Sequence, residues 1–138
     1  MKAVAVLETC LYAADLDAAE RFYTNVLGLE VLSRTPGRNV FFRCGRGVFL
    51  VFDPARTARE TLTVGGSRVP LHGATGAGHA AFAMGERDVD AWRGQLREAS
   101  VPIESEVLWP GGGRSLYFRD PAGNSVELAT PRTWGLPE

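Results

Sequence analysis

Apolar residues in the first fifty positions occur at two spacings, which predict a strand, a helix and three further strands. Residues 4–12 (VAVLETCLY) are apolar and partly β-branched, as in a strand. From Leu16 the apolar residues recur at helical spacing, directly after Asp15, which is a suitable helix N-cap. Gly28 stands where such a helix would end. The three further strands are predicted in the segments LEVLSR, NVFFRC and GVFLVF.

The same order of elements recurs in the second half of the chain. HAAFAM predicts a strand, and a helix follows from about Asp88, with apolar residues on one face. Three more strands are predicted in VPIESEV, RSLYFRD and NSVELAT, the last two separated by the turn 120–124. Placing Glu8 on His79 also aligns ETCLY with HAAFA. We therefore predict a single α+β domain over 1–138, built from two βαβββ modules at 4–53 and 77–130 and joined by the polar loop 54–76.

Composition narrows the classes of function. The chain is 45% apolar with a net charge of −1, and it has no basic stripe, so nucleic acid is not expected as a partner. No apolar run is long enough to span a membrane. Glu8 interrupts the apolar start, which argues against a signal peptide. Cys10 and Cys44 show no disulfide or zinc spacing, which is typical of reduced thiols in a cytoplasmic protein.

Three ionisable residues occupy comparable positions in the predicted strands. Side chains alternate between the faces of a strand, so Glu8, His79 and Glu127 each lie on a face whose other residues are mostly small or apolar. A buried carboxylate is normally paired, protonated or bound to a metal. Two carboxylates and an imidazole converging from such positions would form a metal site with open positions for substrate.

Each of these residues also has a structural interpretation. Glu8 could face solvent at a strand edge, and a single histidine such as His79 is more often structural than a ligand. Glu127 could pair with Arg114 or Arg119. Their joint placement in matching strands of a repeated unit favours the metal site over these separate interpretations.

The segments ETCLYAADLDAAERFYTNVLGLEVL, GHAAFAM and SLYFRDPAGNSVEL resemble the vicinal oxygen chelate superfamily over about residues 4–130. Its members include glyoxalase I, fosfomycin resistance proteins, extradiol dioxygenases and the metal-free bleomycin resistance proteins. The resemblance implies paired βαβββ modules whose curled mixed sheets surround a cup.

By position, the resemblance implies that Glu8, His79 and Glu127 are the metal ligands. Glu8 and Glu127 are then the candidate catalytic residues, with Glu8 serving as ligand or general base. A fourth ligand of glyoxalase I falls on Leu50, which argues against glyoxalase I chemistry in its usual form. Such an oxygen-rich site suits one divalent ion, Mn, Fe or Mg, although Zn or Ni could also bind.

The resemblance further implies that Ser115 and Tyr117 contact the substrate. Arg114 or Arg119 could bind an anionic substrate bidentately, or each could be a surface or structural arginine. We expect a metalloenzyme that activates a small oxygenated substrate by Lewis-acid chemistry, as a lyase, isomerase, transferase or dioxygenase. The alternatives are a metal-free protein that sequesters a ligand such as an antibiotic, and a degenerate relative with a structural or regulatory role. His72 would approach a substrate only if loop 54–76 folds over the cup. A homodimer is expected, because open sheets leave strand edges to cover.

Overall fold

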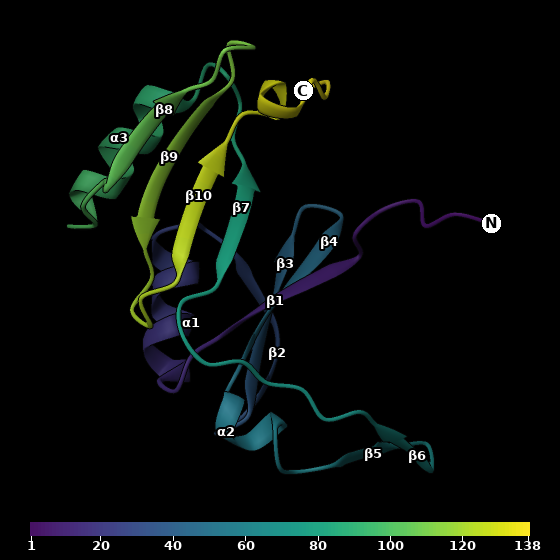
Figure 1. The fold of residues 1–138 in the computed structure, drawn as a ribbon. Helices are drawn as coiled ribbons and strands as arrows, with labels where there is room; N and C mark the ends of the chain where they lie inside the picture. The colour runs from purple at the N-terminus through teal and green to yellow at the C-terminus, as the bar shows by residue number, and fades with distance from the viewer. The chain divides into compact units, whose positions relative to one another are not determined.

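A computed structural model describes all residues from Met1 to Glu138. The chain divides into two compact units, Met1–Gly76 and Ala77–Glu138, which are described separately below. Figure 1 shows that each unit contains a curved sheet with one long helix against it.

The first unit has a four-stranded mixed sheet in the order β1-β4-β3-β2. Strand β1 runs parallel to β4, and the other neighbours are antiparallel. The elements are β1 (Glu8–Tyr12), α1 (Leu16–Asn25), β2 (Glu30–Thr35), β3 (Asn39–Cys44), β4 (Gly47–Phe52), α2 (Pro54–Thr57), β5 (Leu62–Val64) and β6 (Ser67–Val69).

Helix α1 begins and packs as its sequence predicts. The side chain of Asp15 accepts a hydrogen bond from the backbone N–H of Ala18 at 2.9 Å, which confirms it as the N-cap. One face of α1 is buried, and Tyr23 on that face contacts the rings of Phe42 and Phe49. Each fully buried apolar side chain of this kind contributes about 1.5–3 kcal/mol. The sheet face under α1 is therefore core.

The second unit repeats this arrangement with the order β7-β10-β9-β8. Its register also matches, since Glu8 pairs with Val48 across the parallel strands of the first unit and His79 pairs with Ser125 in the second. The predicted fold of paired βαβββ modules is confirmed. The elements are β7 (His79–Ala83), α3 (Val89–Glu98), β8 (Ser105–Leu108), β9 (Arg114–Arg119), β10 (Ser125–Ala129) and the short 3-10 helix η1 (Pro131–Trp134).

The structure corrects three predicted segments. The first strand begins at Glu8 rather than at residue 4, because no neighbouring strand pairs with 4–6, and Val4 and Val6 are exposed. The strand predicted at 101–107 is displaced to Ser105–Leu108. The connection 54–76, predicted as a loop, contains α2 and the β5–β6 hairpin.

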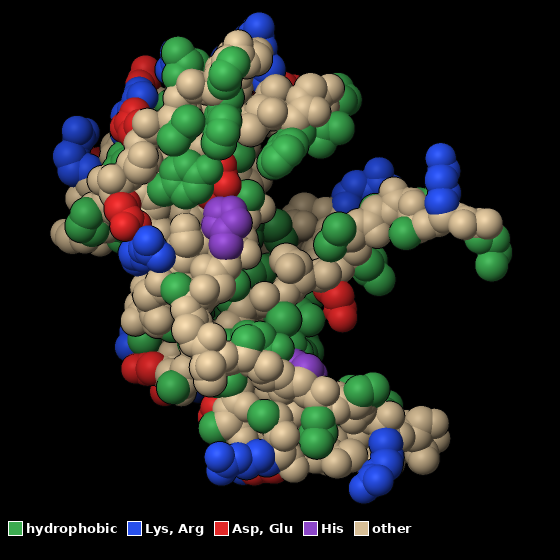
Figure 2. Space-filling model, viewed as in Figure 1, with side chains coloured by type: hydrophobic (Ala, Val, Ile, Leu, Met, Phe, Trp, Pro, Cys, Tyr) green, Lys and Arg blue, Asp and Glu red, His purple; other side chains and the backbone are tan.

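The outer surface carries no concentrated basic region in the view of Figure 2, where the Lys and Arg side chains are scattered. This agrees with the net charge of −1. None of the helices has the length and apolar character of a membrane-spanning segment.

Candidate metal site

Three neighbouring strands of the second unit bring His79, Glu127 and Tyr117 to one face of the sheet. Ser125 of β10 pairs with His79 of β7, and Glu127 pairs with Tyr117 of β9. Since alternate residues of a strand share a face, Glu127 lies on the same side as Ser125 and therefore as His79. The opposite face is core, with Val126 and Leu128 almost fully buried.

His79 and Glu127 are in direct contact. The distance from His79 Nε2 to Glu127 Oε2 is 3.2 Å, and His79 Nδ1 lies 3.1 Å from the backbone oxygen of Ser125. A carbonyl oxygen can only accept, so Nδ1 carries a proton and Nε2 of a neutral ring presents its lone pair to the carboxylate. Two electron-rich atoms face each other at this distance only with a proton or a cation between them.

This arrangement fits a divalent ion. Metal-bound histidines usually donate their second N–H to a carbonyl or carboxylate, as His79 does to Ser125. Two ligand atoms each about 2.1 Å from one ion and at right angles to each other lie about 3 Å apart, close to the observed separation. The side chain of Glu127 is only 8% exposed and the side chain of His79 is 52% exposed, so the carboxylate is shielded from solvent and the imidazole is accessible to it.

Tyr117 stands beside this pair. Its ring is stacked on the imidazole of His79, with centroids 6.3 Å apart. Burial, followed by hydrogen bonding to Glu127 and the charge of that carboxylate, raises the pKa of the Tyr117 phenol. The phenol therefore stays protonated near neutral pH.

The turn between β9 and β10 fixes the start of β7. Asp120 Oδ1 accepts from the backbone N–H of Ala122 and of Asn124, at 2.9 and 2.8 Å. The Asn124 amide donates to Asp120 Oδ2 at 2.8 Å, and its oxygen accepts from the N–H of Gly78 at 2.8 Å. Since Gly78 directly precedes His79, this buried turn holds the histidine strand in register with β10.

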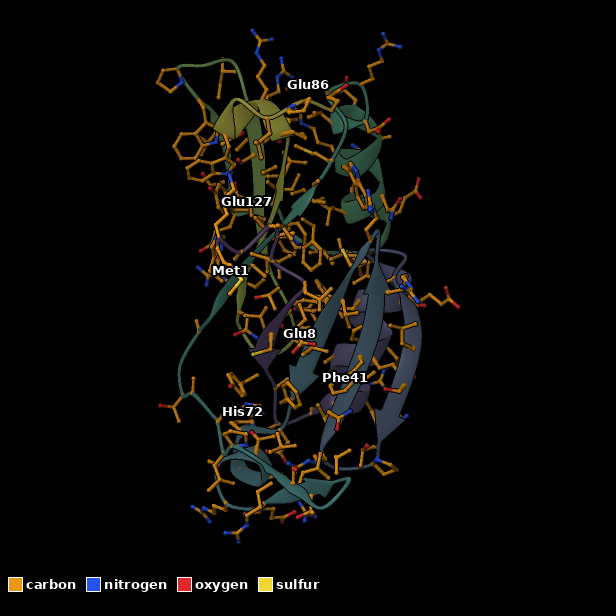
Figure 3. The ribbon with its side chains drawn as sticks, turned by 90° about the vertical axis from the view of Figure 1, so that its right-hand side faces the viewer. Met1, Glu8, Phe41, His72, Glu86 and Glu127 are labelled. Carbon is orange, nitrogen blue, oxygen red and sulfur yellow. The ribbon has the colours of Figure 1, made fainter.

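Glu8 belongs to the first unit, where it is exposed near Cys10 on the side of β1 away from α1 (Figure 3). Leu50 is the register partner of Cys10 on that face and is buried, so β4 offers no ligand there. No group of three or more His, Cys, Asp or Glu side chains able to hold a metal is formed. The structure thus brings His79 and Glu127 together, and the part of Glu8 in the site stays a prediction.

The predicted substrate contacts separate into two faces. Ser115 and Tyr117 share the face of Glu127, although Ser115 is only 1% exposed. Arg114 alternates with them and shares the side of buried Leu116, which is the helix-covered side. Arg119 forms two hydrogen bonds to Glu104, at 2.7 and 3.1 Å. The ion-pair partner of Glu127 is His79, and neither Arg114 nor Arg119 pairs with it.

A second cluster lies within the first unit, on the side of β1 and β4 away from α1. The Tyr12 hydroxyl is 2.9 Å from Nδ1 of His72, whose ring also meets that of Phe52 at a centroid distance of 4.6 Å. The backbone N–H of His72 donates to the oxygen of Thr57 at 3.1 Å, which anchors this part of the connection to α2. Phe41 extends the cluster by an edge contact with Phe52 (Figure 3). Sequence reasoning missed this placement, because the partners are sixty residues apart.

Both cysteines are free, as their spacing predicted. Burial raises the pKa of the Cys44 thiol, so this group stays protonated near neutral pH and is unsuited to act as a nucleophile.

Comparison with known proteins places the chain in a family. A model of the Glyoxalase/Bleomycin resistance protein/Dioxygenase superfamily matches residues 5–128, and the chain belongs to this superfamily. A lactoylglutathione lyase from Agrobacterium tumefaciens is 44% identical with a TM-score of 0.90, over 99% of this chain and 100% of that one. No curated protein sequence matches.

More distant solved structures support the fold alone. A glyoxalase/bleomycin resistance protein/dioxygenase from Nocardioides is 24% identical with a TM-score of 0.71, over 94% of this chain and 85% of that one. A fosfomycin resistance protein from Listeria monocytogenes is 18% identical with a TM-score of 0.66, over 94% of each chain.

Proposed function

We propose that this member of the glyoxalase superfamily is a divalent-metal-dependent enzyme that acts on a small oxygenated substrate. The contact between His79 Nε2 and the buried Glu127 carboxylate carries the proposal, because the carbonyl of Ser125 leaves that nitrogen available as a ligand. A bound divalent ion would supply Lewis-acid chemistry, polarising a carbonyl or similar oxygen of the substrate.

Four residues of the chain would have separate roles in the site. His79 and Glu127 would hold the ion, and the half-exposed histidine side leaves room for a substrate to approach. Tyr117, kept protonated, would hold the carboxylate and present its ring to the substrate side. Glu8 would act as a third ligand or as a general base, a role that rests on its position in the sequence.

The reaction type is proposed from the name of a relative and from the residue at position 50. The Agrobacterium relative is named a lactoylglutathione lyase, so S-lactoylglutathione is the first substrate to assay. Leu50 provides neither a ligand nor a proton-transfer group at its position on β4. We therefore expect poor activity on this compound and turnover of another small oxygenated substrate.

Metal binding is the decisive test. Calorimetry with Mn²⁺, Fe²⁺, Mg²⁺, Zn²⁺ and Ni²⁺ should show about one ion per chain, as a single site requires. His79→Ala should abolish binding. The control is His72→Ala, which removes the only other histidine and should leave the affinity unchanged. Stable wild-type protein that binds none of these ions would overturn the proposal.

Glu8 has its own test. If Glu8 is a ligand, Glu8→Gln should weaken metal binding, since an amide oxygen is a poorer ligand than a carboxylate. Unchanged metal affinity with lost turnover would assign it as a base instead. Unchanged affinity and unchanged turnover would remove Glu8 from the site.

The first unit offers one observation in favour of the alternative, a metal-free ligand-sequestering protein. Its cluster of Tyr12, Phe41, Phe52 and His72 includes partly exposed aromatic rings suited to stacking on a planar ligand. Calorimetry of metal-free protein with bleomycin and other planar antibiotics tests this function. Binding that Phe41→Ala abolishes would support it, and no binding across the panel would count against it.

A further inference from the structure

A surface cavity lies at the end of α3 in the second unit, on residues that the proposed metal site does not use. Its volume is about 470 Å³, which is within the range of cavities that bind small organic molecules. The lining consists of two arginines, a serine and three apolar residues: Arg93, Arg97, Ser100, Val101, Pro102 and Ile103. No acidic residue belongs to this lining, so the cavity combines an apolar wall with positive charge.

Helix α3 ends at this cavity in a Schellman motif. The backbone N–H of Val101 donates to the carbonyl of Leu96 at 2.8 Å, and the N–H of Ser100 donates to the carbonyl of Arg97 at 3.0 Å. The first residue beyond the end of such a helix adopts a left-handed backbone and is usually glycine. Here it is Ser100, whose φ is 56°, and no other residue of the chain except glycine has a positive φ.

A serine at this place reduces stability relative to a glycine, because the Cβ of an L-residue is crowded in the left-handed conformation. The first unit avoids this cost, since Gly28, with a φ of 67°, is the left-handed residue that follows α1. Residues held in such conformations often belong to functional sites. The side chain of Ser100 lines the cavity, and its hydroxyl has no hydrogen-bond partner within the protein. That hydroxyl is therefore available to a ligand.

The two arginines of the cavity differ in what they already bind. Arg93 donates to both carboxylate oxygens of Glu106, at 3.0 and 2.7 Å, and also pairs with Asp90. Arg97 lies one turn further along α3, is exposed, and forms no ion pair or side-chain hydrogen bond. Its charge suits the C-terminal end of the helix dipole, but that interaction leaves its N–H donors unused. Arg97 is therefore the cation that a ligand in the cavity can pair with.

We infer that this cavity is a binding site for a small organic anion, a carboxylate that carries an apolar chain or ring. The planar guanidinium of Arg97 binds the carboxylate through two N–H donors, and the Ser100 hydroxyl donates to the same group. Val101, Pro102 and Ile103 cover the apolar part of the ligand. The site lies outside the function proposed above and needs no metal.

Octanoate is the probe, and its binding to the purified protein is followed by calorimetry and by NMR of the backbone amides. Octanoate should bind, and the largest amide shifts should fall within residues 93–103. 1-Octanol has the same chain without the charge, so it should bind about 10-fold more weakly, the effect of one hydrogen bond to a charged group. No binding of octanoate at millimolar concentration, equal binding of 1-octanol, or shifts confined to other residues would overturn the inference.

The assignment of Arg97 is tested by substitution. Arg97→Gln should weaken octanoate binding by about 10-fold, because the charged partner is lost. Arg87→Gln, just before the opposite end of α3, is the matched control and should keep wild-type affinity. His79→Ala should also keep it, which separates this site from the proposed metal site. Wild-type affinity in Arg97→Gln, or equal losses in Arg97→Gln and Arg87→Gln, would overturn the inference.

Ser100→Gly distinguishes a ligand-binding serine from a structural one. It removes the hydroxyl and also relieves the left-handed conformation, so it should raise the urea midpoint while weakening octanoate binding by about 3- to 10-fold. Ser100→Ala should weaken binding to the same extent without raising the midpoint, since alanine keeps the crowded Cβ. Wild-type octanoate affinity in both variants would overturn the role of Ser100 in the site.

Discussion

Replacing Asn124 by alanine should destabilise the second unit strongly, because its side chain closes the turn before β10. Asn124 is 1% exposed, and its amide joins Asp120 Oδ2 and the N–H of Gly78 at 2.8 Å each. A hydrogen bond to a charged group contributes about 1.5–3 kcal/mol and a neutral one about 1 kcal/mol. Asn124→Ala removes one of each, so we expect a loss of about 2.5–4 kcal/mol from the free energy of unfolding.

Urea denaturation followed by tryptophan fluorescence is a suitable assay. Trp92, Trp109 and Trp134 are the only tryptophans, and all three lie in the second unit, so the signal reports that unit. Glu98→Ala, at the exposed end of α3 in the same unit, is the control and should change stability by less than about 0.5 kcal/mol. A loss below about 1 kcal/mol for Asn124→Ala would refute the assigned role of the turn.

Three further predictions concern acid stability, packing and assembly. Hydrogen bonding to Arg119 and the charge of Arg119 lower the pKa of Glu104 in the folded state. This pair therefore stabilises the fold above the unfolded pKa of Glu104, and the contribution is lost as the pH falls through the folded pKa. Arg119→Met should flatten the acid limb of a pH–stability curve, and an unchanged limb would contradict this. Gly113→Ala should cost about 1–3 kcal/mol in urea denaturation, because its Cβ would lie 2.3 Å from the backbone nitrogen of Thr133, and an unaltered midpoint would contradict that packing. Sedimentation should show a homodimer of the 14.9 kDa chain, because open sheets leave strand edges to cover; a monomer at all concentrations would count against the prediction.

Periodicity predicted the long elements correctly because local sequence and tertiary burial agree there. In α1 the cap at Asp15 and the buried positions Phe22 and Tyr23 follow the helical repeat. The strand predicted from residue 4 fails for the opposite reason, since apolar character alone does not supply a neighbouring strand. Val4 and Val6 are apolar, yet no strand pairs with them.

The β5–β6 hairpin was predictable but was read as part of a loop. Gly65 and Gly66 both have positive φ values, 56° and 81°, as a two-residue hairpin turn requires, and both glycines are visible in the sequence. Leu62 and Val69 pair across the strands, and Val64 shares their face by alternation. The Gly and Pro content of the segment concealed this short period-two pattern.

In the candidate site, too, some contacts could be predicted from the sequence and others could not. The contact between His79 and Glu127 follows from strand parity and the duplicated register, both of which the sequence contains. The contact between Tyr12 and His72 depends on the path of the connection and on the bond from His72 to Thr57, which no local pattern encodes. Trp109 reaches Ser115 through a turn whose geometry depends on Gly112.

The duplicated register also explains how one fold gives two different sheet faces. Cys10 pairs with Leu50 across the parallel strands of the first unit, and Ala81 pairs with Glu127 at the same place in the second. The backbone thus presents equivalent positions, and side chains alone decide their chemistry. With leucine the first face becomes an apolar surface beside aromatic rings, and with glutamate the second holds a buried charge that needs His79 and Tyr117 around it. Burial therefore limits whether leucine and glutamate can replace each other at positions 50 and 127. A glutamate at position 50 would face Cys10 and Phe41 without a donor such as Tyr117.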